Sequence, residues 1–358
     1  MRVKNIAQPR VRTRARDLTW PGHGRFQGVL KPTLRVFAAW RPCVNPPGFQ
    51  KGISRKDAKS QRIAKPKHRD QPAKRALVCP TDFTDNAFSM PPQLTIVVPA
   101  YNEAARLGLS LAKTLEYLNQ NFESSELIVV DDGSTDDTAG VAEKAMAESG
   151  AVSTRVIRYE PNRGKGYAVR VGLLAAQADV VLFTDADLST PITETPKLVD
   201  PIRSGEFDVT FGSRALDRSL IGVHQPWRRE QGGRLFNLIV RAATGLPFWD
   251  TQCGFKAFRM SVCRPLIESV QIERFGFDVE LIYVAHLAGL RLSEIPVRWN
   301  NDAASKVSVV RDSFRMVDEV LRIRSAASRG DYDAAIEAVK KLTTEDIEKK
   351  SKGARAKS

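Results

Sequence analysis

The feature that most constrains the fold is an alternation, between residues 94 and 204, of short apolar runs rich in β-branched residues and longer segments with helical periodicity. The runs are Leu94–Val98, Leu127–Val130, Arg155–Tyr159 and Val180–Thr184, and the helical patterns cover Glu103–Asn119, Asp136–Ser149, Gly164–Gln177 and Pro191–Ser204. Strands that alternate with helices of about ten or more residues indicate a parallel sheet in an α/β fold. In such sheets, ligands bind beyond the carboxyl ends of the strands. The sequence therefore predicts the fold class and the edge of the sheet where a site would lie.

Further along the chain the pattern continues with less regularity. We expect strands over Asp208–Gly212 and Leu292–Val297 and helices over Arg228–Thr244, Phe277–Ala288 and Val309–Ile323. Beyond Arg329 the charges become denser, and a frayed helical tail is expected. The predicted organisation is a basic leader over residues 1–92, one α/β domain over residues 93–328 and a charged C-terminal tail over residues 329–358.

The positive charge of the chain is concentrated in the leader. The formal net charge is +14, but residues 1–92 contain 20 Lys and Arg against 5 Asp and Glu, whereas the rest contains 35 against 36. The leader is rich in Pro and lacks sustained periodicity, so we expect it to be disordered. The explanations that compete for this leader are an over-extended reading frame with its true start at Met90 or a nonfunctional leader, a tail attracted to anionic lipid, and a nucleic-acid-binding arm. It also resembles an organellar transit peptide, although its length and prolines argue against that. Because the main body is close to neutral, we expect no nucleic-acid partner.

The cysteines and the hydropathy indicate in which cellular compartment the protein is expected. Cys43, Cys79, Cys253 and Cys263 lie far apart and show no CxxC spacing, which fits a reducing compartment rather than a disulfide framework or a zinc site. No run of about 18 apolar residues indicates a membrane-spanning helix. The N-terminus lacks the apolar core of a secretion signal. We expect a cytoplasmic protein that contacts the cytoplasmic face of a membrane.

Two acids, Asp185 and Asp187, follow the run Val180–Thr184 directly. Residues two apart on an extended strand point the same way, so the two carboxylates are expected to converge. A hard divalent cation, Mg²⁺ or Mn²⁺, bound there would keep its other positions for phosphate oxygens. The alternative is a loop cap without a metal.

Polar segments also follow the other three runs, namely Pro99–Glu103, Asp131–Asp136 and Asn162–Gly166. Ser134 or Thr135 can cap the next helix, which leaves the preceding acid pair free to accept the N–H of a uracil ring. The glycines of the third segment let the backbone approach a ligand closely, and a helix N-terminus favours phosphate. Neither a Walker A loop nor a Gly-x-Gly-x-x-Gly fingerprint is present, so a nicotinamide cofactor is not indicated.

These four segments, in this order, resemble the nucleotide-sugar half of the family-two glycosyltransferases with the GT-A fold, over roughly Leu94 to Lys306. Further segments look like those of the dolichyl-phosphate β-glucosyltransferases and their prokaryotic relatives: Gly212–Arg214, Asp250–Lys256, Phe277–Glu280, Val297–Trp299 and Ser305–Val307. In the related mannosyltransferases, the stretch corresponding to Asp250–Lys256 usually differs. This chain departs from the eukaryotic glucosyl enzymes in having a basic leader where they carry a membrane anchor, and slightly in the segment that starts at Asp185.

The resemblance implies an inverting transfer of glucose from UDP-glucose to a polyprenyl phosphate of the dolichyl type. A phosphate monoester has a second pKa of about 6, so it is mostly dianionic near neutrality and needs no strong base. The alternatives are the same fold with another donor or acceptor, as in a dolichyl-phosphate mannose synthase or a polysaccharide glycosyltransferase, and, more distantly, a nucleotidyltransferase.

Roles for single residues follow from the resemblance and from charge. Catalytic roles are expected for Asp187, Asp250, Arg214 and Arg229. Donor-binding roles are expected for Pro99, Tyr101, Glu103, Asp131, Asp132, Lys165, Asp185 and Gln252. Asp185 and Asp187 are the expected metal ligands, and the resemblance implies that Asp187 is the firmer of the two. The acceptor phosphate is assigned to Arg214, Arg228, Arg229 and Lys306, since a guanidinium fork matches phosphate oxygens. Glu280 is expected to pair with Lys256 or Arg298.

Overall fold

The computed structural model of the protein describes residues 91–223, 225–301 and 309–355. They belong to one compact unit, Thr81–Ser358. The predictions for residues 1–90 and for Lys306 lie outside the described residues. The same holds for the side chains of Arg228 and Arg229, although their backbone belongs to a helix.

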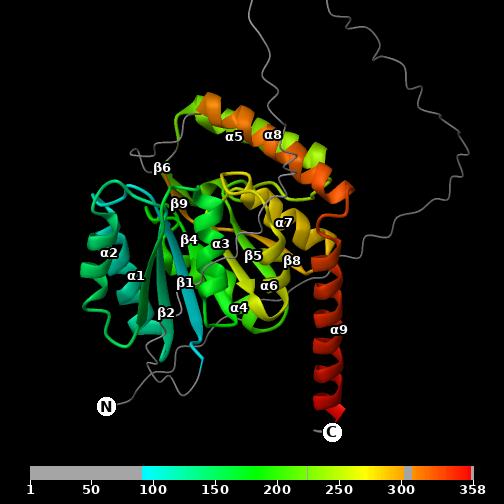
Figure 1. Cartoon of the computed structure of the whole chain (residues 1–358), viewed down its shortest axis with the longest axis horizontal. Helices are drawn as coiled ribbons and strands as arrows, with labels where there is room; N and C mark the ends of the chain where they lie inside the picture. The colour runs from blue at the N-terminus through cyan, green and yellow to red at the C-terminus, as the bar shows by residue number, and fades with distance from the viewer. Residues whose placement is uncertain (1–90, 224, 302–308, 356–358) are drawn as a thin grey trace, which may run out of the picture. The chain divides into compact units, whose positions relative to one another are not determined.

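A seven-stranded sheet forms the middle layer of this unit (Figure 1). In spatial order its strands are β3 (Ser153–Arg158), β2 (Ser125–Asp131), β1 (Leu94–Ala100), β4 (Val180–Thr184), β7 (Phe255–Arg259), β5 (Val209–Ser213) and β8 (Leu292–Pro296). Neighbouring strands are parallel, except that β7 is antiparallel to both β4 and β5. The predicted α/β fold with a mostly parallel, Rossmann-like sheet is confirmed.

Strand β7 is absent from the expectations drawn from the sequence. Its second residue, Lys256, interrupts the apolar run that the other inner strands show. The structure accommodates this lysine at 0% exposure because Asp278 pairs with it, with Nζ and Oδ1 2.5 Å apart. A buried charge of this kind is tolerated only when it is paired.

Helices cover both faces of the sheet. One apolar core contains residues of α1 (Leu107–Asn121), α2 (Thr138–Met146) and α4 (Thr195–Arg203), and the other contains residues of α3 (Lys165–Ala175), α6 (Met260–Ser269) and α7 (Phe277–Leu287). Alternate residues of one strand serve different cores, as the pleat requires: Ile96 and Val98 of β1 face one core and Val97 the other. Burial on both faces explains why the inner strands are continuous apolar runs.

The helices begin later than the sequence predicts. The pattern that starts at Glu103 becomes helical only at Leu107, and the one that starts at Asp136 only at Thr138. The intervening residues form turns, and Asn102 has a φ of 55°. These turns hold the polar segments at the ends of the strands. The helices start late because the residues before them form these turns.

Two further helices, α5 (Trp227–Thr244) and α8 (Val309–Ser328), lie side by side (Figure 1), and each contributes buried residues to the core that contains α3, α6 and α7, such as Val240 of α5 and Val320 of α8. A small parallel sheet of β6 (Ile221–Val223) and β9 (Trp299–Asn300) lies in the segments near the start of α5. Within the described part of the chain, no helix combines the length and the apolar character needed to cross a bilayer.

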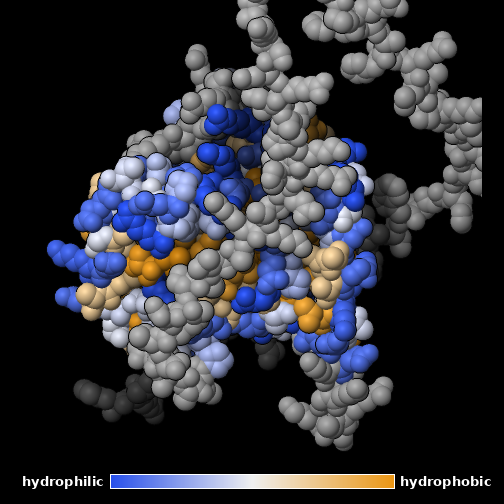
Figure 2. Space-filling view, viewed as in Figure 1, coloured by the Kyte–Doolittle hydropathy of each residue, from blue (hydrophilic) through white to orange (hydrophobic). Residues whose placement is uncertain are grey.

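The segment beyond Arg329 differs from the frayed tail that the sequence predicts. It forms a continuous helix, α9 (Asp333–Arg355), that packs on α6, and Tyr332 and Val339 are buried in the core. The surface along α9 is mostly hydrophilic in Figure 2, so the many charged residues of this segment lie on the side of the helix that faces away from the core. The few apolar residues on its inner side are too sparse to be recognised by periodicity alone.

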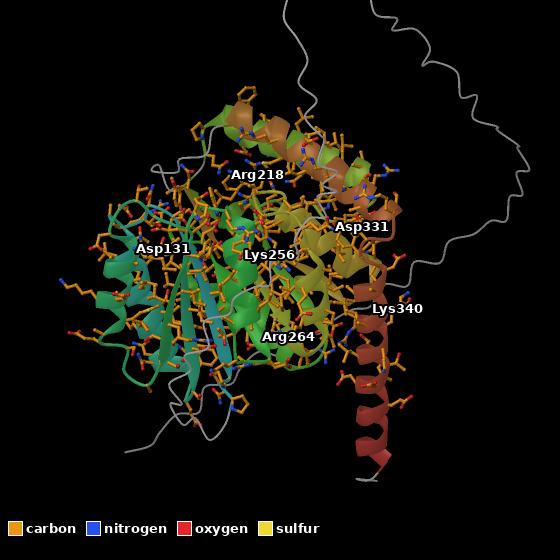
Figure 3. The ribbon with its side chains drawn as sticks, in the orientation of Figure 1. Asp131, Arg218, Lys256, Arg264, Asp331 and Lys340 are labelled. Carbon is orange, nitrogen blue, oxygen red and sulfur yellow. The ribbon has the colours of Figure 1, made fainter. Side chains whose placement is uncertain are left out.

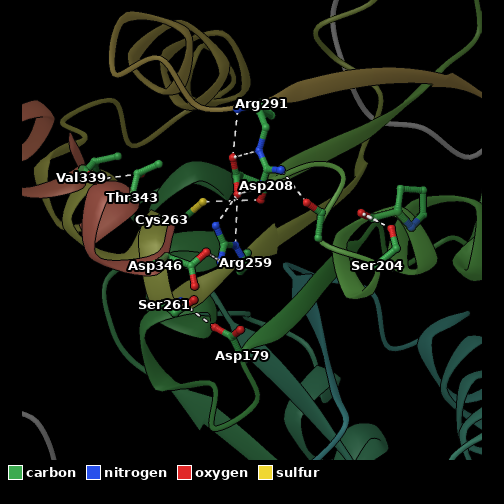
Figure 4. A network of polar contacts seen from close by, with 12 residues as sticks. Asp179, Ser204, Asp208, Arg259, Ser261, Cys263, Arg291, Val339, Thr343 and Asp346 are labelled. Carbon is green, nitrogen blue, oxygen red and sulfur yellow. Dashed lines mark hydrogen bonds and ion pairs between the residues drawn. The ribbon is translucent and has the colours of Figure 1, made fainter. Parts of the chain in front are cut away.

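An ion-pair network ties α9 to the sheet (Figure 4). Buried Asp208 accepts hydrogen bonds from Arg259 (Nη2, 2.6 Å) and Arg291 (Nη2, 2.8 Å). Arg259 also donates from Nη1 to Asp346 of α9 at 2.7 Å. Burial opposes ionisation of Asp208, but these guanidinium groups hold its pKa below the ordinary value overall. The network anchors the last helix at the end of the strands remote from the polar segments.

Candidate active site

The four polar segments predicted at the strand ends meet along one edge of the sheet. Asp131 is in register with Ala100 on β1 and with Arg158 on β3. Asp132 N donates to Ala100 O at 2.9 Å, and Asn102 N donates to Ser134 Oγ at 2.9 Å. The segments that follow β1 and β2 are thus joined by hydrogen bonds to one another.

Asp132 joins the segment after β2 to the segment after β3. Its carboxylate accepts hydrogen bonds from Asn162 Nδ2, Arg163 N and Gly164 N, each at 2.8 Å. With both oxygens engaged, Asp132 fixes the loop that contains Gly164. Asp132 therefore shapes that loop, and its role in donor binding stays a prediction.

One carboxylate oxygen of Asp131 accepts no hydrogen bond from the described residues, whereas both oxygens of Asp132 do. Its side chain is fully buried, and Oδ1 accepts a hydrogen bond from Ser134 N at 2.9 Å. Oδ2 lies 3.5 Å from Arg158 Nε but has no hydrogen-bond partner among the residues that the structure describes. A buried carboxylate oxygen without a donor is costly in the free protein, and an N–H of a ligand would satisfy it.

A second loop supports the segment Asn162–Gly166 from behind. Gly164 has a φ of 115°, and a Cβ there would lie 2.6 Å from Glu273 O, while a Cβ on Gly166 would lie 2.6 Å from Phe277 Cβ. Tyr167 N donates to Glu273 O at 3.1 Å. The two loops are therefore in backbone contact, which only glycine permits at these positions.

Glu280 holds the supporting loop in place. It is fully buried on α7 and accepts hydrogen bonds from Gln271 N (2.8 Å), Ile272 N (2.7 Å) and Tyr332 Oη (2.5 Å). Burial raises the pKa of this carboxyl, and the hydrogen bonds oppose the rise. The predicted pairing of Glu280 with Lys256 or Arg298 is wrong, because Lys256 pairs with Asp278 and Arg298 with Glu194.

Asp185 and Asp187 lie in the turn that follows β4, not on the strand itself, and Leu188 N donates to Asp185 O at 3.1 Å within that turn. Asp185 Oδ1 lies 2.5 Å from Lys165 Nζ, and Asp187 Oδ1 accepts a hydrogen bond from Ser189 N at 2.9 Å. Asp187 Oδ2 is 3.9 Å from Arg106 Nη1. The fourth segment is thus connected to the third through Lys165.

The charges in this turn influence one another. Burial, and then the charge of Asp185, raise the pKa of Asp187 above its ordinary value. Burial alone would lower the pKa of Lys165, but the nearby carboxylates raise it overall. Two carboxylates that repel one another within a partly buried turn suit a divalent cation, which takes oxygen ligands and relieves the repulsion. The donor set therefore fits Mg²⁺ or Mn²⁺.

Gly254 allows the segment Asp250–Lys256 to pack against this turn. Asp185 N donates to Gly254 O at 3.1 Å, and a Cβ on Gly254 would clash with the carboxylate of Asp185. The segment that the sequence singles out for its family resemblance therefore forms one wall around the acidic turn.

Arg214 and Asp250, to which the sequence assigns separate roles, pair with one another. Arg214 donates to both oxygens of Asp250, from Nε at 2.6 Å and from Nη2 at 2.8 Å. Gln252 N donates to Asp250 Oδ1 at 3.1 Å, so this residue contributes its backbone to the same carboxylate. Burial favours the neutral carboxyl, but Arg214 holds the pKa of Asp250 below its ordinary value. Arg214 keeps 29% of its side chain exposed and can still contact a ligand.

A cavity of about 440 Å³ opens beside this pair. Its walls come from the loop after β5, from η2 (Arg218–Leu220) and from one side of α5, and include Arg214, Arg218, Arg234, Arg241, Trp249 and Trp299. Figure 3 labels Arg218 between the sheet and α5. Asn300, the neighbour of Trp299, donates from its backbone N to Ser189 O at 2.8 Å. The cavity is thus joined to the turn that holds Asp187.

The remaining residues predicted to bind the donor lie at the same edge of the sheet as the four polar segments. Pro99 is buried within β1, and Tyr101 beyond it is 43% exposed. Glu103 forms an ion pair with Arg106, which in turn faces Asp187. Sequence reasoning missed Arg106, Arg218 and Arg234, because an arginine in a turn or on an exposed helix carries no distinguishing pattern.

Comparison with known proteins shows the family to which the chain belongs. Residues 95–266 match the glycosyl transferase family 2. The chain is 31% identical over 241 residues to the dolichyl-phosphate beta-glucosyltransferase of Dictyostelium discoideum, covering 64% of this chain and 73% of the relative. The enzyme of the same name from Drosophila melanogaster is 37% identical over 229 residues (60% and 69%), and that from Homo sapiens 34% over 244 residues (65% and 75%). The chain belongs to glycosyltransferase family 2.

Solved structures include one of glucosyl-3-phosphoglycerate synthase from Mycobacterium tuberculosis in complex with Mn²⁺, UDP and glucosyl-3-phosphoglycerate. It is 23% identical, with a TM-score of 0.48, and the match covers 65% of this chain and 80% of that chain.

Proposed function

We propose that the protein transfers glucose from UDP-glucose to a polyprenyl phosphate with inversion at the anomeric carbon. The observation that carries this proposal is the junction of two differently built regions. Four hydrogen-bonded strand ends with acceptors for a nucleotide and a cation adjoin a cavity lined by arginine and tryptophan. The similarity to several dolichyl-phosphate beta-glucosyltransferases supports the choice of sugar and acceptor.

The donor lies along the strand ends. Asp131 Oδ2, which lacks a donor in the described structure, accepts the N–H of the uracil ring. The loop Asn162–Gly166 and Lys165 face the diphosphate, and Asp187 with Asp185 would hold Mg²⁺ or Mn²⁺. When bound, the cation stabilises the negative charge that develops on the departing UDP.

The acceptor occupies the cavity. Its phosphate contacts Arg214, whose orientation Asp250 fixes, and the isoprenoid chain follows Trp249, Trp299 and Leu238. Since the phosphate is largely dianionic near neutrality, the residues around it align and hold it rather than remove a proton. Attack from this side, opposite the leaving UDP, inverts the configuration in one displacement.

Helices α5 and α8 contact the membrane that supplies the lipid. Trp227, Leu235 and Leu238 of α5 are 72%, 60% and 60% exposed, and Leu321 of α8 is 57% exposed. Exposed large apolar side chains that flank a lipid cavity are suited to insertion at a bilayer surface. Co-sedimentation with vesicles that contain anionic lipid, reduced by Leu235→Asp, tests this contact.

Label transfer tests the proposed reaction. Purified protein is incubated with Mg²⁺ or Mn²⁺ and a labelled donor, which is UDP-glucose, UDP-N-acetylglucosamine or GDP-mannose. The acceptor is either polyprenyl phosphate or a soluble phosphate monoester. We expect label in an organic-extractable, acid-labile product only with UDP-glucose and polyprenyl phosphate. Transfer from GDP-mannose, or transfer to the soluble acceptor alone, would contradict the proposal.

A further inference from the structure

Carboxylate side chains line the cavity beside Arg214, together with its arginines. Among its described lining residues, four arginines (Arg214, Arg218, Arg234 and Arg241) accompany two acids, Asp250 and Glu230. Asp250 is buried and uses both oxygens on Arg214. Glu230, in contrast, lies in the first turn of α5, away from the strand ends that Asp250 helps to hold together.

Glu230 bridges the two walls of the cavity. Its carboxylate forms an ion pair with Arg218 of η2, and it accepts a hydrogen bond from Arg234 Nη2 of α5 at 2.9 Å. Glu230 is 22% exposed, whereas Arg218 and Arg234 are 46% and 53% exposed. Ion pairs exposed to this degree contribute little stability, so an incoming anion can exchange with the carboxylate.

The two guanidinium groups line the same cavity as Arg214, to which the proposed function assigns the acceptor phosphate, and they face a carboxylate there. A phosphate dianion offers more charge and more acceptor oxygens than a carboxylate, and guanidinium binds both in the same fork geometry. Glu230 and the phosphate therefore compete for the same donors.

We propose that Glu230 is a built-in competitor of the acceptor, which occupies Arg218 and Arg234 in the free enzyme and is displaced by the acceptor phosphate. This inference rests on the proposed function. It has an unusual consequence, because removing the charge of a residue that lines the binding site strengthens binding instead of weakening it.

Calorimetric titration of the full-length protein with geranyl phosphate, in the presence of UDP and Mn²⁺, tests the inference without turnover. We expect Glu230→Gln to lower the dissociation constant about three- to fivefold, which matches the free energy of an exposed ion pair. Glu230→Asp, which keeps the charge near the helix N-terminus but shortens the reach to Arg218, should show a smaller gain in the same direction. Glu337→Gln, which removes an exposed carboxylate paired with Lys340 on α9, is the matched control and should leave affinity unchanged.

An unchanged or raised dissociation constant in Glu230→Gln would overturn the inference, since Glu230 would then support the arginines rather than compete for them. If the wild-type protein transfers glucose to polyprenyl phosphate but the two proteins bind geranyl phosphate equally, only the inference fails. Absence of binding in both proteins, together with absence of transfer, would remove the proposed function as well.

Discussion

Around the loop Asn162–Gly166, on the proposed donor side, buried carboxylates accept hydrogen bonds from backbone N–H groups, whereas on the cavity wall formed by η2 and α5, on the proposed acceptor side, arginines pair with Glu230 through partly exposed side chains. Asp132 and Glu280 each receive two backbone N–H groups. Arg218 and Arg234 instead share one carboxylate across a cavity. The donor edge is thus preorganised, while the acceptor wall can exchange its partners. A substitution on the proposed donor side should therefore lower turnover strongly. On the proposed acceptor side the remaining side chains can form new pairs, so the loss of turnover should be smaller.

The largest expected effect is that of Asp187→Ala. Loss of the firmer cation ligand should lower turnover by about a hundredfold or more, as the loss of single electrostatic stabilisers does. The melting temperature should fall little, because the Asp187 carboxylate lies at a partly buried turn and its hydrogen bond from Ser189 N stays within that turn. Steady-state rates with Mn²⁺, with Asp318→Asn on α8 as the control, test this effect. Near-normal turnover would remove Asp187 from the chemistry.

A pair of glycine substitutions tests the comparison directly. Gly254→Ala places a Cβ against the Asp185 carboxylate and should lower turnover at least about tenfold, since small displacements in the site are costly. Gly233→Ala on α5 meets nothing within 4 Å and should stabilise the protein by about 0.5–1 kcal/mol through helix propensity. Equal effects of the two substitutions on turnover would contradict the distinction between the two sides.

Arg214→Lys should separate the two substrates. Lysine cannot reproduce the two-point pairing with Asp250, so KM for the polyprenyl phosphate should rise about tenfold, in line with the loss of a charged hydrogen bond. KM for UDP-glucose should stay unchanged. Initial rates with each substrate varied in turn provide the measurement, and a rise in KM for UDP-glucose alone would place Arg214 on the donor side.

The smallest effect is expected for Tyr332→Phe. The hydroxyl group of Tyr332 is one of three donors to Glu280, and its removal should cost about 1 kcal/mol of unfolding free energy. UDP affinity should fall only about two- to threefold, because two backbone N–H groups still hold the supporting loop. Denaturant unfolding and UDP titration measure the two effects. An affinity equal to that of the wild type would show that Tyr332 does not influence the loop Asn162–Gly166.

The sequence predicts which acids lie at the ends of the strands, because these residues are next to the apolar runs that form the strands. Asp131 and Asp185 come directly after or at the end of apolar runs, so their place in the fold follows from the sheet alone. The convergence of Asp185 and Asp187 was predicted from an extended strand, yet the structure places both acids in a turn. The distinction between Asp131, with a free oxygen, and Asp132, with none, depends on partners about 30 residues away and is invisible in the sequence.

The acceptor side is harder to predict because its contacts are distant and its residues are ordinary. Arg214 and Asp250 are 36 residues apart, and only the fold shows that they are partners. Strand β7 is hidden by Lys256, whose partner Asp278 lies 22 residues away. The helix α9 is hidden because its charged surface outweighs the few residues that it buries, such as Val339.

Calorimetric titration with UDP tests most directly the claim that the acids at the strand ends hold a nucleotide diphosphate through a divalent cation. We predict measurable binding of UDP to the full-length protein with Mn²⁺ or Mg²⁺ and an affinity at least about tenfold lower with chelator present, since the metal contributes several kcal/mol where phosphate charge is held. Absence of UDP binding with either metal, or an affinity that the chelator leaves unchanged, would contradict the account.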